Sequence, residues 1–226
     1  MTPIVYLFDI DGTLVTGDGA GRRALRQVFG RRYRRHDALD RVVFHGATDR
    51  AILREALLAL GVAHDEAHID AVLAEYVAVL AVVVDPGAYR PERGVVALLD
   101  ALDGRPGLAV GLGTGNIEPG ARIKLAAAGL NPYFGFGGFG SDAEDRAELL
   151  AIGALRGAAR LGVPQAACRV VVIGDTIRDV AAAHAIGAFC LAVATGGNSV
   201  AELRAAGAEV VVADLEDPAA RAALIG

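Results

Sequence analysis

The sequence predicts an α/β protein built on a parallel β-sheet, and two features of the chain lead to that fold class. Short, almost unbroken runs of Val, Ile and Leu recur along the 226 residues, each bounded by turn residues. Such runs are typical of parallel strands that are buried on both faces. Segments with helical periodicity lie between the runs, so each strand would be followed by a crossover helix. In sheets of this kind, ligands bind at the carboxyl ends of the strands.

The apolar runs and the helical patterns alternate in a simple order. The expected strands cover residues 4–8, 109–112, 170–173, 189–194 and 210–213. The expected core helices cover residues 94–102, 119–128, 144–161, 177–186 and 199–206. Polar residues end these strands, namely Asp9, Thr114, Asp175, Thr195 and Asp214.

One long segment between the first two expected strands breaks this alternation. It contains no convincing strand, and its helical patterns cover residues 20–29, 49–60 and 65–84. Thr48 or Asp49 would cap the second of these helices. Gly and Pro lie near both joints of the segment, as they often do at hinges. We therefore predict a core domain of residues 1–16 and 88–226, with a helical cap domain of residues 17–87 inserted into it.

Composition and charge exclude several classes of protein. The chain is 54% hydrophobic and 22% charged, which suits a well-packed globular protein and not a disordered one. The net charge of −5 argues against a general nucleic-acid binder. The longest apolar stretch, residues 76–84, is too short to span a bilayer, and the first strand begins too early for a secretory signal. Cys168 and Cys190 form no disulfide framework or zinc pattern, so we expect reduced thiols in a cytoplasmic protein without a membrane partner.

Asp9 and Asp11 are the most informative pair of residues, in the sequence Asp-Ile-Asp-Gly-Thr directly after the first apolar run. Residues two apart in a strand share a face, so both carboxylates can point at one small volume. Two acids placed in this way repel each other unless a cation or a protonated partner relieves the repulsion. Mg²⁺ with a phosphate substrate would do so, because it prefers one or two carboxylates plus phosphate oxygens. The alternative is a pair of loop acids in an ordinary Asp-Gly turn.

Thr114, Gly115 and Asn116 end the second core strand and lead into a helix. A hydroxyl, a flexible glycine and free backbone N–H groups at a helix start can cradle a phosphate, although an ordinary strand-to-helix turn has the same composition. Lys124 follows in that helix and is the single lysine among 22 basic residues. Because helical side chains tilt toward the N-terminus, Lys124 could reach this loop and neutralise a phosphoryl group. The alternative is a solvated surface lysine, which is the commoner case.

Asp175 and Asp179 form the third group, in the sequence Gly-Asp-Thr-Ile-Arg-Asp. Asp175 ends a parallel strand as Asp9 does, and Asp179 lies four residues on, at the start of the next helix. Acids in the first turn of a helix are common as caps that the helix dipole favours. That alternative explains Asp179 better than it explains Asp175.

These motifs together resemble the haloacid dehalogenase-like hydrolase superfamily. The Asp-x-Asp-Gly-Thr motif, the Thr114 loop, a cation and the Gly-Asp-x-x-x-Asp motif occur in that superfamily's order and at its strand ends. The resemblance covers essentially the whole chain. It implies a Rossmann-like parallel-sheet core, and the helical insertion looks like a C1-type cap. The sequences of residues 114–125 and 139–146 look like the phosphoglycolate-phosphatase-like branch.

The resemblance also implies roles for the four acids. Asp9 would be the nucleophile that forms an aspartyl-phosphate. Asp11 would be the general acid for the leaving oxygen and then the base that activates water. The implied cofactor is Mg²⁺, held by the Asp9 carboxylate, the Asp11 backbone carbonyl and Asp175. Asp179 would support these metal ligands.

Phosphoryl binding is the other role that the resemblance implies. Thr114, Gly115 and Asn116 would bind the transferring group, and Lys124 would offset its charge. Many relatives instead place the cationic lysine just before the helix that precedes the last aspartate motif. This chain has no lysine there, and Arg146 is the reserve candidate for the role.

Other activities of the superfamily depend on the same residues. A dehalogenase lacks an acid equivalent to Asp11, and a phosphonatase uses a cap lysine, which the insertion here does not contain. A sugar phosphomutase stays open as an alternative, because cap cations could hold a bisphosphate intermediate. The candidates for these cations are Arg22, Arg23, Arg50 and Arg54. A non-catalytic binding module on the same scaffold is a further alternative, although no nucleophile or metal acid is lost.

We therefore expect a Mg²⁺-dependent phosphatase that hydrolyses a small phosphorylated metabolite. Phosphoglycolate is the first substrate that the resemblance implies, with other small phosphomonoesters close behind. The core motifs would contact only the phosphoryl group, so the cap would select the leaving group. The sequence gives no indication of the oligomeric state.

Overall fold

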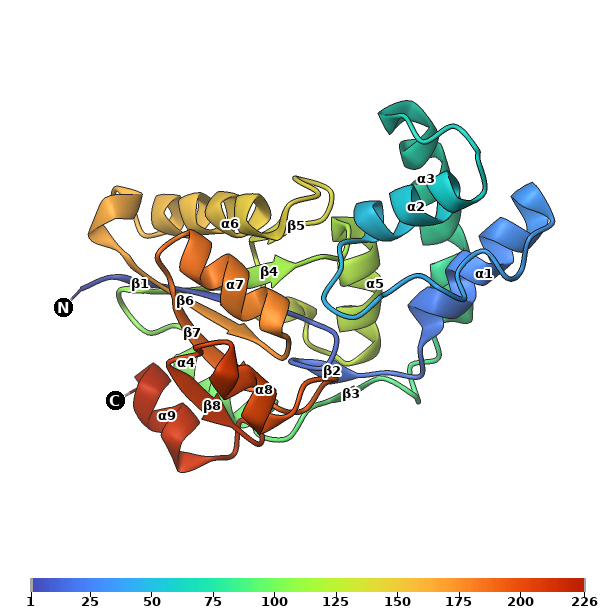
Figure 1. Cartoon of the computed structure of the whole chain (residues 1–226). Coiled ribbons are helices and arrows are strands. Elements are labelled where there is room, and N and C mark those ends of the chain that lie inside the picture. The colour runs from blue at the N-terminus through green and yellow to red at the C-terminus, as the bar shows by residue number, and fades with distance from the viewer. Residues whose placement is uncertain (1, 226) are drawn as a thin grey trace.

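A six-stranded parallel sheet lies at the centre of the computed structural model, which describes residues 2–225 (Figure 1). The strand order is β5-β4-β1-β6-β7-β8. The strands are β1 (Ile4–Phe8), β4 (Leu108–Thr114), β5 (Gly137–Phe139), β6 (Arg169–Gly174), β7 (Phe189–Val193) and β8 (Val210–Val212). β1 pairs with β4 on one side and with β6 on the other. The order of strands therefore reverses at β1, the kind of position where open α/β sheets bind ligands.

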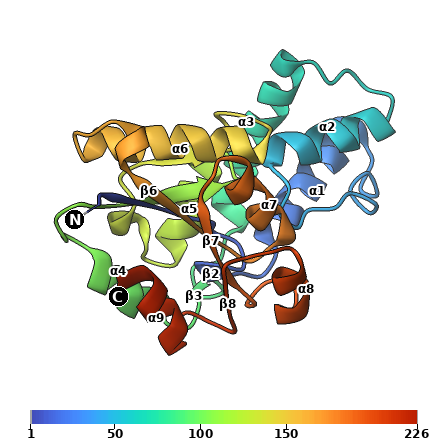
Figure 2. The same ribbon diagram turned by 60° about the vertical axis from the view of Figure 1, so that its left-hand side comes forward.

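Helices cover both faces of the sheet (Figures 1 and 2). Val5 and Leu7 of β1 pack under α6 and α7, whereas Tyr6 and Phe8 belong to the cluster on the opposite face with α4, α5 and α9. This burial on both faces explains why the strand sequences are continuously apolar. The core helices are α4 (Val95–Leu102), α5 (Glu118–Ala127), α6 (Arg146–Arg160), α7 (Ile177–Ala185), α8 (Val200–Ala205) and α9 (Pro218–Ile225), with short 3₁₀ turns at Asn131–Tyr133 and Gln165–Ala167.

Three further helices lie beyond the carboxyl ends of the strands (Figure 1). They are α1 (Ala20–Tyr33), α2 (Asp49–Ala59) and α3 (Glu66–Val83), and we call them the helical segment. α1 packs against α3, and α3 also contacts α5 of the core. The strands β2 (Val15–Thr16) and β3 (Arg90–Pro91) form an antiparallel ribbon where the chain enters and leaves this segment.

The expected α/β fold and its five strands are confirmed, with strand ends that shift by at most two residues. α1 runs beyond its expected end to Tyr33. Thr48 caps α2, because its Oγ1 accepts the Ala51 N–H at 3.3 Å. The expectation missed β2, β3, β5 and α9. Within residues 2–225, no helix combines the length and the apolar character that crossing a bilayer requires.

Candidate active site

Three polar side chains meet at the carboxyl ends of three adjacent strands. Asp9 follows β1, Thr114 is the last residue of β4, and Asp175 follows β6. The parallel register brings these ends level, since Phe8 pairs with both Leu112 and Ile173. All three side chains are buried. The sheet therefore gathers residues that lie between 61 and 166 positions apart in the sequence.

Asp9, Asp175 and Asp179 form a compact acidic cluster. Each offers a carboxylate oxygen, and the three oxygens lie within 4.8 Å of one another. Burial raises the pKa of Asp175 to about 8, and the neighbouring charges of Asp179 and Asp9 push it in the same direction. Burial also raises the pKa of Asp9 to about 6, although the nearby Arg146 guanidinium opposes the shift. Three buried acids at this separation create a strong demand for a cation.

Asp175 has one carboxylate oxygen that the protein leaves unsatisfied. The Thr13 hydroxyl donates to Oδ1 at 3.1 Å. Oδ2 is buried and accepts no hydrogen bond from residues 2–225. The nearest basic atom recorded is His45 Nε2 at 3.6 Å, which itself accepts the Gly197 N–H at 3.1 Å. A buried oxygen without a partner in a cluster of acids is the kind of group that a hard metal ion satisfies.

The oxygens of Asp179 are in contrast already occupied. Asp179 and Thr176 form a capping box at the start of α7, in which Oδ2 accepts the Thr176 N–H at 3.0 Å and its hydroxyl at 2.7 Å. Oδ1 accepts Arg146 Nε at 2.7 Å. These contacts fix Asp179 beside Asp9 and Asp175. The arrangement suits a residue that orients metal ligands better than one that is a ligand itself.

Arg146 is the cation that contacts Asp9. It is the first residue of α6, whose N-cap is Asp145. Its Nη2 lies 2.9 Å from Asp9 Oδ2 and 2.6 Å from Asp179 Oδ1. The guanidinium is buried with both acids, which raises its pKa above the ordinary value despite the opposing effect of burial. The reserve candidate for the cationic role therefore lies beside Asp9.

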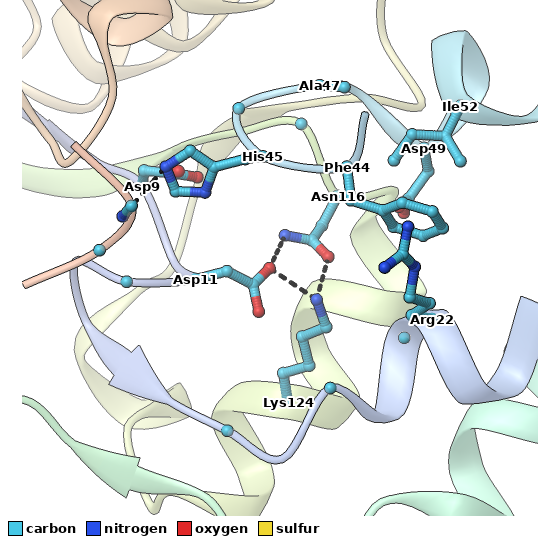
Figure 3. Close-up of a pocket in the computed structure, with 18 of the residues that line it drawn as sticks. Asp9, Asp11, Arg22, Phe44, His45, Ala47, Asp49, Ile52, Asn116 and Lys124 are labelled. Carbon is cyan, nitrogen blue, oxygen red and sulfur yellow. Dashed lines mark hydrogen bonds and ion pairs between the residues drawn. The ribbon is translucent and has the colours of Figure 1, made fainter. Parts of the chain in front are cut away.

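Lys124 contacts the other acid of the first motif (Figure 3). Its Nζ donates to Asp11 Oδ2 at 2.6 Å and to Asn116 Oδ1 at 2.7 Å. Asn116 Nδ2 in turn donates to Asp11 Oδ2 at 2.9 Å, and to the Thr114 hydroxyl at 3.0 Å. Burial alone would raise the pKa of Asp11, but Lys124 and Asn116 outweigh it and hold the pKa below its usual value. Lys124 is thus no surface lysine, since only 5% of it is exposed.

Asp9 and Asp11 have separate partners although they are two residues apart. The shared face of a strand is not available to them, because β1 ends at Phe8 and the chain turns at Gly12, whose φ is +83°. Asp9 is buried in the acidic cluster, whereas the Asp11 side chain is only about half buried, with 52% of it exposed, and faces Lys124. Both still line the same cavity. In this structure each carboxylate is paired with a different cation, Asp9 with Arg146 and Asp11 with Lys124.

A cavity of about 650 Å³ lies between the strand ends and the helical segment. Asp9, Asp11, Gly115, Asn116, Lys124 and Arg146 line it from the core. Arg22, Leu25, Val42, Phe44, Ile52 and Tyr76 line it from the helical segment. Such a volume suits a small-molecule ligand.

The first turn of α2 docks directly on the loop after β4, which sequence reasoning missed. The Asp49 N–H donates to Gly115 O at 2.8 Å, and the Asp49 carboxylate accepts the Ile117 N–H at 2.9 Å. A methyl group on Gly115 would come within 2.6 Å of Ala47 O, so these two segments of the chain are in close contact there. Of the two N-cap candidates that the sequence offered, Thr48 is the cap and Asp49 is the first residue of the helix.

Of the four arginines considered for a bisphosphate site, only Arg22 lines the cavity. The others form ion pairs elsewhere: Arg23 with Asp18, Arg50 with Glu66 and Asp70, and Arg54 with Glu66 and Glu144.

Comparison with known proteins agrees with this fold and site. The family model of the haloacid dehalogenase-like hydrolases matches residues 5–187. A hydrolase from Pseudomonas syringae is similar in structure, with 22% identity over 99% of each chain and a TM-score of 0.71. CbbY from Rhodobacter sphaeroides, solved with phosphate, is 18% identical over 98% of this chain and 99% of that chain, with a TM-score of 0.73. No curated protein matches the chain.

At these identities the structural likeness establishes the fold alone. The family match covers most of the chain and includes the motifs of Asp9, Thr114 and Asp175. The chain therefore belongs to the haloacid dehalogenase-like hydrolases.

Proposed function

We propose that the protein is a Mg²⁺-dependent phosphatase that hydrolyses a small phosphomonoester through an aspartyl-phosphate. One observation carries the proposal: Asp9, Asp175 and Asp179 meet at the strand ends, with a buried oxygen of Asp175 left without a partner. CbbY, a structural neighbour, has been solved with phosphate and, as a variant, with xylulose-1,5-bisphosphate. These ligands support a phosphorylated small molecule as the substrate class here.

The residues of the acidic cluster fit a magnesium ion. Carboxylate and carbonyl oxygens are the donors that Mg²⁺ prefers. We assign the ion to the Asp9 carboxylate, the Asp11 backbone carbonyl and Asp175, with Asp179 in support. When bound, Mg²⁺ would offset the negative charge that the carboxylates and the phosphoryl group bring together.

The side chains suggest how the two displacements proceed. An Asp9 oxygen attacks phosphorus, a P–O bond forms, and the bond to the leaving oxygen breaks while Asp11 gives that oxygen a proton. Water then attacks the phosphorus of the aspartyl-phosphate, and Asp11 takes a proton from this water. The P–O bond to Asp9 breaks, which releases phosphate and restores the Asp9 carboxylate. Arg146 keeps the Asp9 carboxylate in place, while Lys124 and Asn116 hold Asp11.

The loop after β4 is the proposed binding site for the phosphoryl oxygens. The Thr114 hydroxyl and the Gly115 N–H would bind them, and Asn116 orients the loop through its bond to Thr114. Arg146, which already contacts Asp9, is the better placed of the two candidate cations to offset the phosphoryl charge. Lys124 would contribute from the side of Asp11.

We further propose that residues 17–87 form a cap domain over a core of residues 1–16 and 88–226. The β2–β3 ribbon lies at both joints, and the helical segment supplies one wall of the cavity. The leaving group would therefore be selected by this segment. Phosphoglycolate and similar small esters are of suitable size for the cavity.

A phosphate-release screen over phosphorylated metabolites, with Mg²⁺ and with EDTA, tests the function. We expect release that depends on Mg²⁺ and that Asp9→Asn abolishes, because the amide is no nucleophile. Mg²⁺ should also raise the unfolding temperature of the wild type but not of Asp175→Asn, which is a readout independent of turnover. Full turnover by Asp9→Asn would exclude the proposed nucleophile, and isomerised sugar phosphate without phosphate release would establish the phosphomutase instead.

A further inference from the structure

Arg22 is held in a fixed position on the cavity wall by neutral groups (Figure 3). It lies in the first turn of α1. Its Nη2 donates to the backbone carbonyls of Leu39 at 3.2 Å and of Val42 at 3.3 Å. Its guanidinium carbon lies 4.5 Å from the centre of the Phe44 ring. These contacts orient the guanidinium but leave its charge unneutralised.

The other cations of the cavity are already neutralised. Lys124 pairs with Asp11, and Arg146 pairs with Asp9 and Asp179. Within residues 2–225, no carboxylate lies within 4.0 Å of an Arg22 nitrogen.

Its neighbours on α1 differ from Arg22 in this respect. Arg23 pairs with Asp18 and Arg26 pairs with Asp40, whereas Arg22, which is exposed as they are, has no acidic partner among residues 2–225. Arg22 therefore combines two properties: it faces the cavity, and its charge is available.

Much of the cavity wall on the side of Arg22 is apolar, although Asp49 also lines the cavity. Leu25, Val42, Phe44 and Ile52 line the same cavity as Arg22. An ion pair formed next to apolar side chains is stronger than one in open water. A guanidinium also presents a planar fork of donors that matches a carboxylate in two parallel hydrogen bonds.

We propose that Arg22 binds a carboxylate on the leaving group, so that the preferred substrates are phosphorylated small organic acids and not phosphate esters of neutral alcohols. The inference rests on the proposed phosphatase function and deepens it. Asp9 would receive the phosphoryl end of the substrate at the strand ends, and Arg22 would receive the acidic end on the helical segment. Arg22 is then a specificity-determining residue.

Matched pairs of esters test the inference on the full-length protein. Phosphoglycolate differs from 2-hydroxyethyl phosphate, and 3-phosphoglycerate from glycerol 3-phosphate, by a carboxylate in place of a CH₂OH group. We expect the wild type to prefer the acid of each pair in kcat/KM. Arg22→Met should lose about 10- to 100-fold for the acids, mainly through KM, and less than about 2-fold for the alcohols.

Two variants separate recognition from a structural role. Arg22→Lys keeps the charge without the fork and should recover part of the preference for the acids. Arg23→Met removes the neighbouring exposed arginine and should leave the preference unchanged. Equal losses on acids and alcohols in Arg22→Met, or a wild type that prefers the alcohols, would overturn the inference alone. If the wild type released no phosphate from any ester, the proposed function would fall and this inference with it.

Discussion

Asp49 provides a test of how the helical segment is fixed to the core. Its carboxylate accepts the Ile117 N–H at 2.9 Å, and the residue is only 8% exposed. Burial raises the pKa of Asp49 from 3.8 to about 6, although Lys124 and the Ile117 N–H oppose the shift. The ionised form is therefore less stable in the folded protein than in the unfolded chain. The variant Asp49→Asn removes this charge and keeps an oxygen that can accept the Ile117 N–H.

The size of the effect follows from the two pKa values. A difference of about 2 units corresponds to about 3 kcal/mol at 1.36 kcal/mol per unit. Between pH 3.8 and about 6 the folded state binds more protons than the unfolded state, so stability falls as the pH rises through this window. The free energy of unfolding of the wild type thus falls by about 3 kcal/mol between low pH and neutral pH because of Asp49. In Asp49→Asn this contribution is absent. About 2 kcal/mol of this change in the free energy of unfolding falls between pH 4.5 and pH 7.5.

Urea unfolding of both proteins across this pH range measures the effect. The free energy of unfolding of Asp49→Asn, minus that of the wild type, should increase by about 2 kcal/mol from pH 4.5 to pH 7.5. Other groups titrate in both proteins and cancel in the difference. Glu55→Gln, on the exposed side of the same helix, is the control and should give a flat difference. A flat or falling difference for Asp49→Asn would refute the inference that a buried, ionised Asp49 joins α2 to the loop after β4.

Two further substitutions probe the site itself. Arg146→Lys keeps the charge but lacks the planar guanidinium that contacts Asp9 and Asp179 together. We therefore expect the rate of phosphate release to fall by about 10- to 100-fold at saturating Mg²⁺. An unchanged kcat would contradict the role of Arg146. Gly115→Ala places a methyl group 2.6 Å from Ala47 O. We therefore expect the free energy of unfolding, measured with urea, to fall by about 1–3 kcal/mol and kcat/KM to fall as well. A variant as stable as the wild type would show that the contact is not tight.

The strands could be predicted because their burial leaves a direct trace in the sequence. Val5 and Leu7 pack on one face of the sheet while Tyr6 and Phe8 pack on the other, so the run contains no polar residue. β5 could not be predicted because it begins with two glycines, and these also have a physical reason. A methyl group on Gly138 would lie 1.8 Å from a backbone oxygen of α6, so glycine is needed where the helix approaches the strand. In the sequence the same glycines resemble a turn.

The acids of the site could be predicted, but the pairing of their cations could not. Asp9 and Asp175 follow apolar strands, and their convergence is a consequence of parallel topology. Which cation reaches which acid depends on how two helices are rotated and where each one begins. α6 begins at Arg146 and places it on Asp9, while Lys124, one full turn or more inside α5, reaches Asp11. No local pattern in the sequence encodes these distances.

Asp9 and Asp11 have different cationic partners, and their pKa values shift in opposite directions. Burial raises the pKa of Asp9 to about 6, which still leaves it ionised at neutral pH, as a nucleophile must be. Lys124 and Asn116 hold the pKa of Asp11 low, which keeps it ionised at neutral pH, so in this arrangement the same contacts oppose the donation of a proton to the leaving oxygen. The same contacts make Asp11 a weaker base toward water in the second displacement. Two-carboxylate sites that separate a nucleophile from an acid give the acid the higher pKa. Here the turn after β1 gives the higher pKa to Asp9, so the proposed role of Asp11 as acid requires that its contacts with Lys124 and Asn116 change when substrate binds.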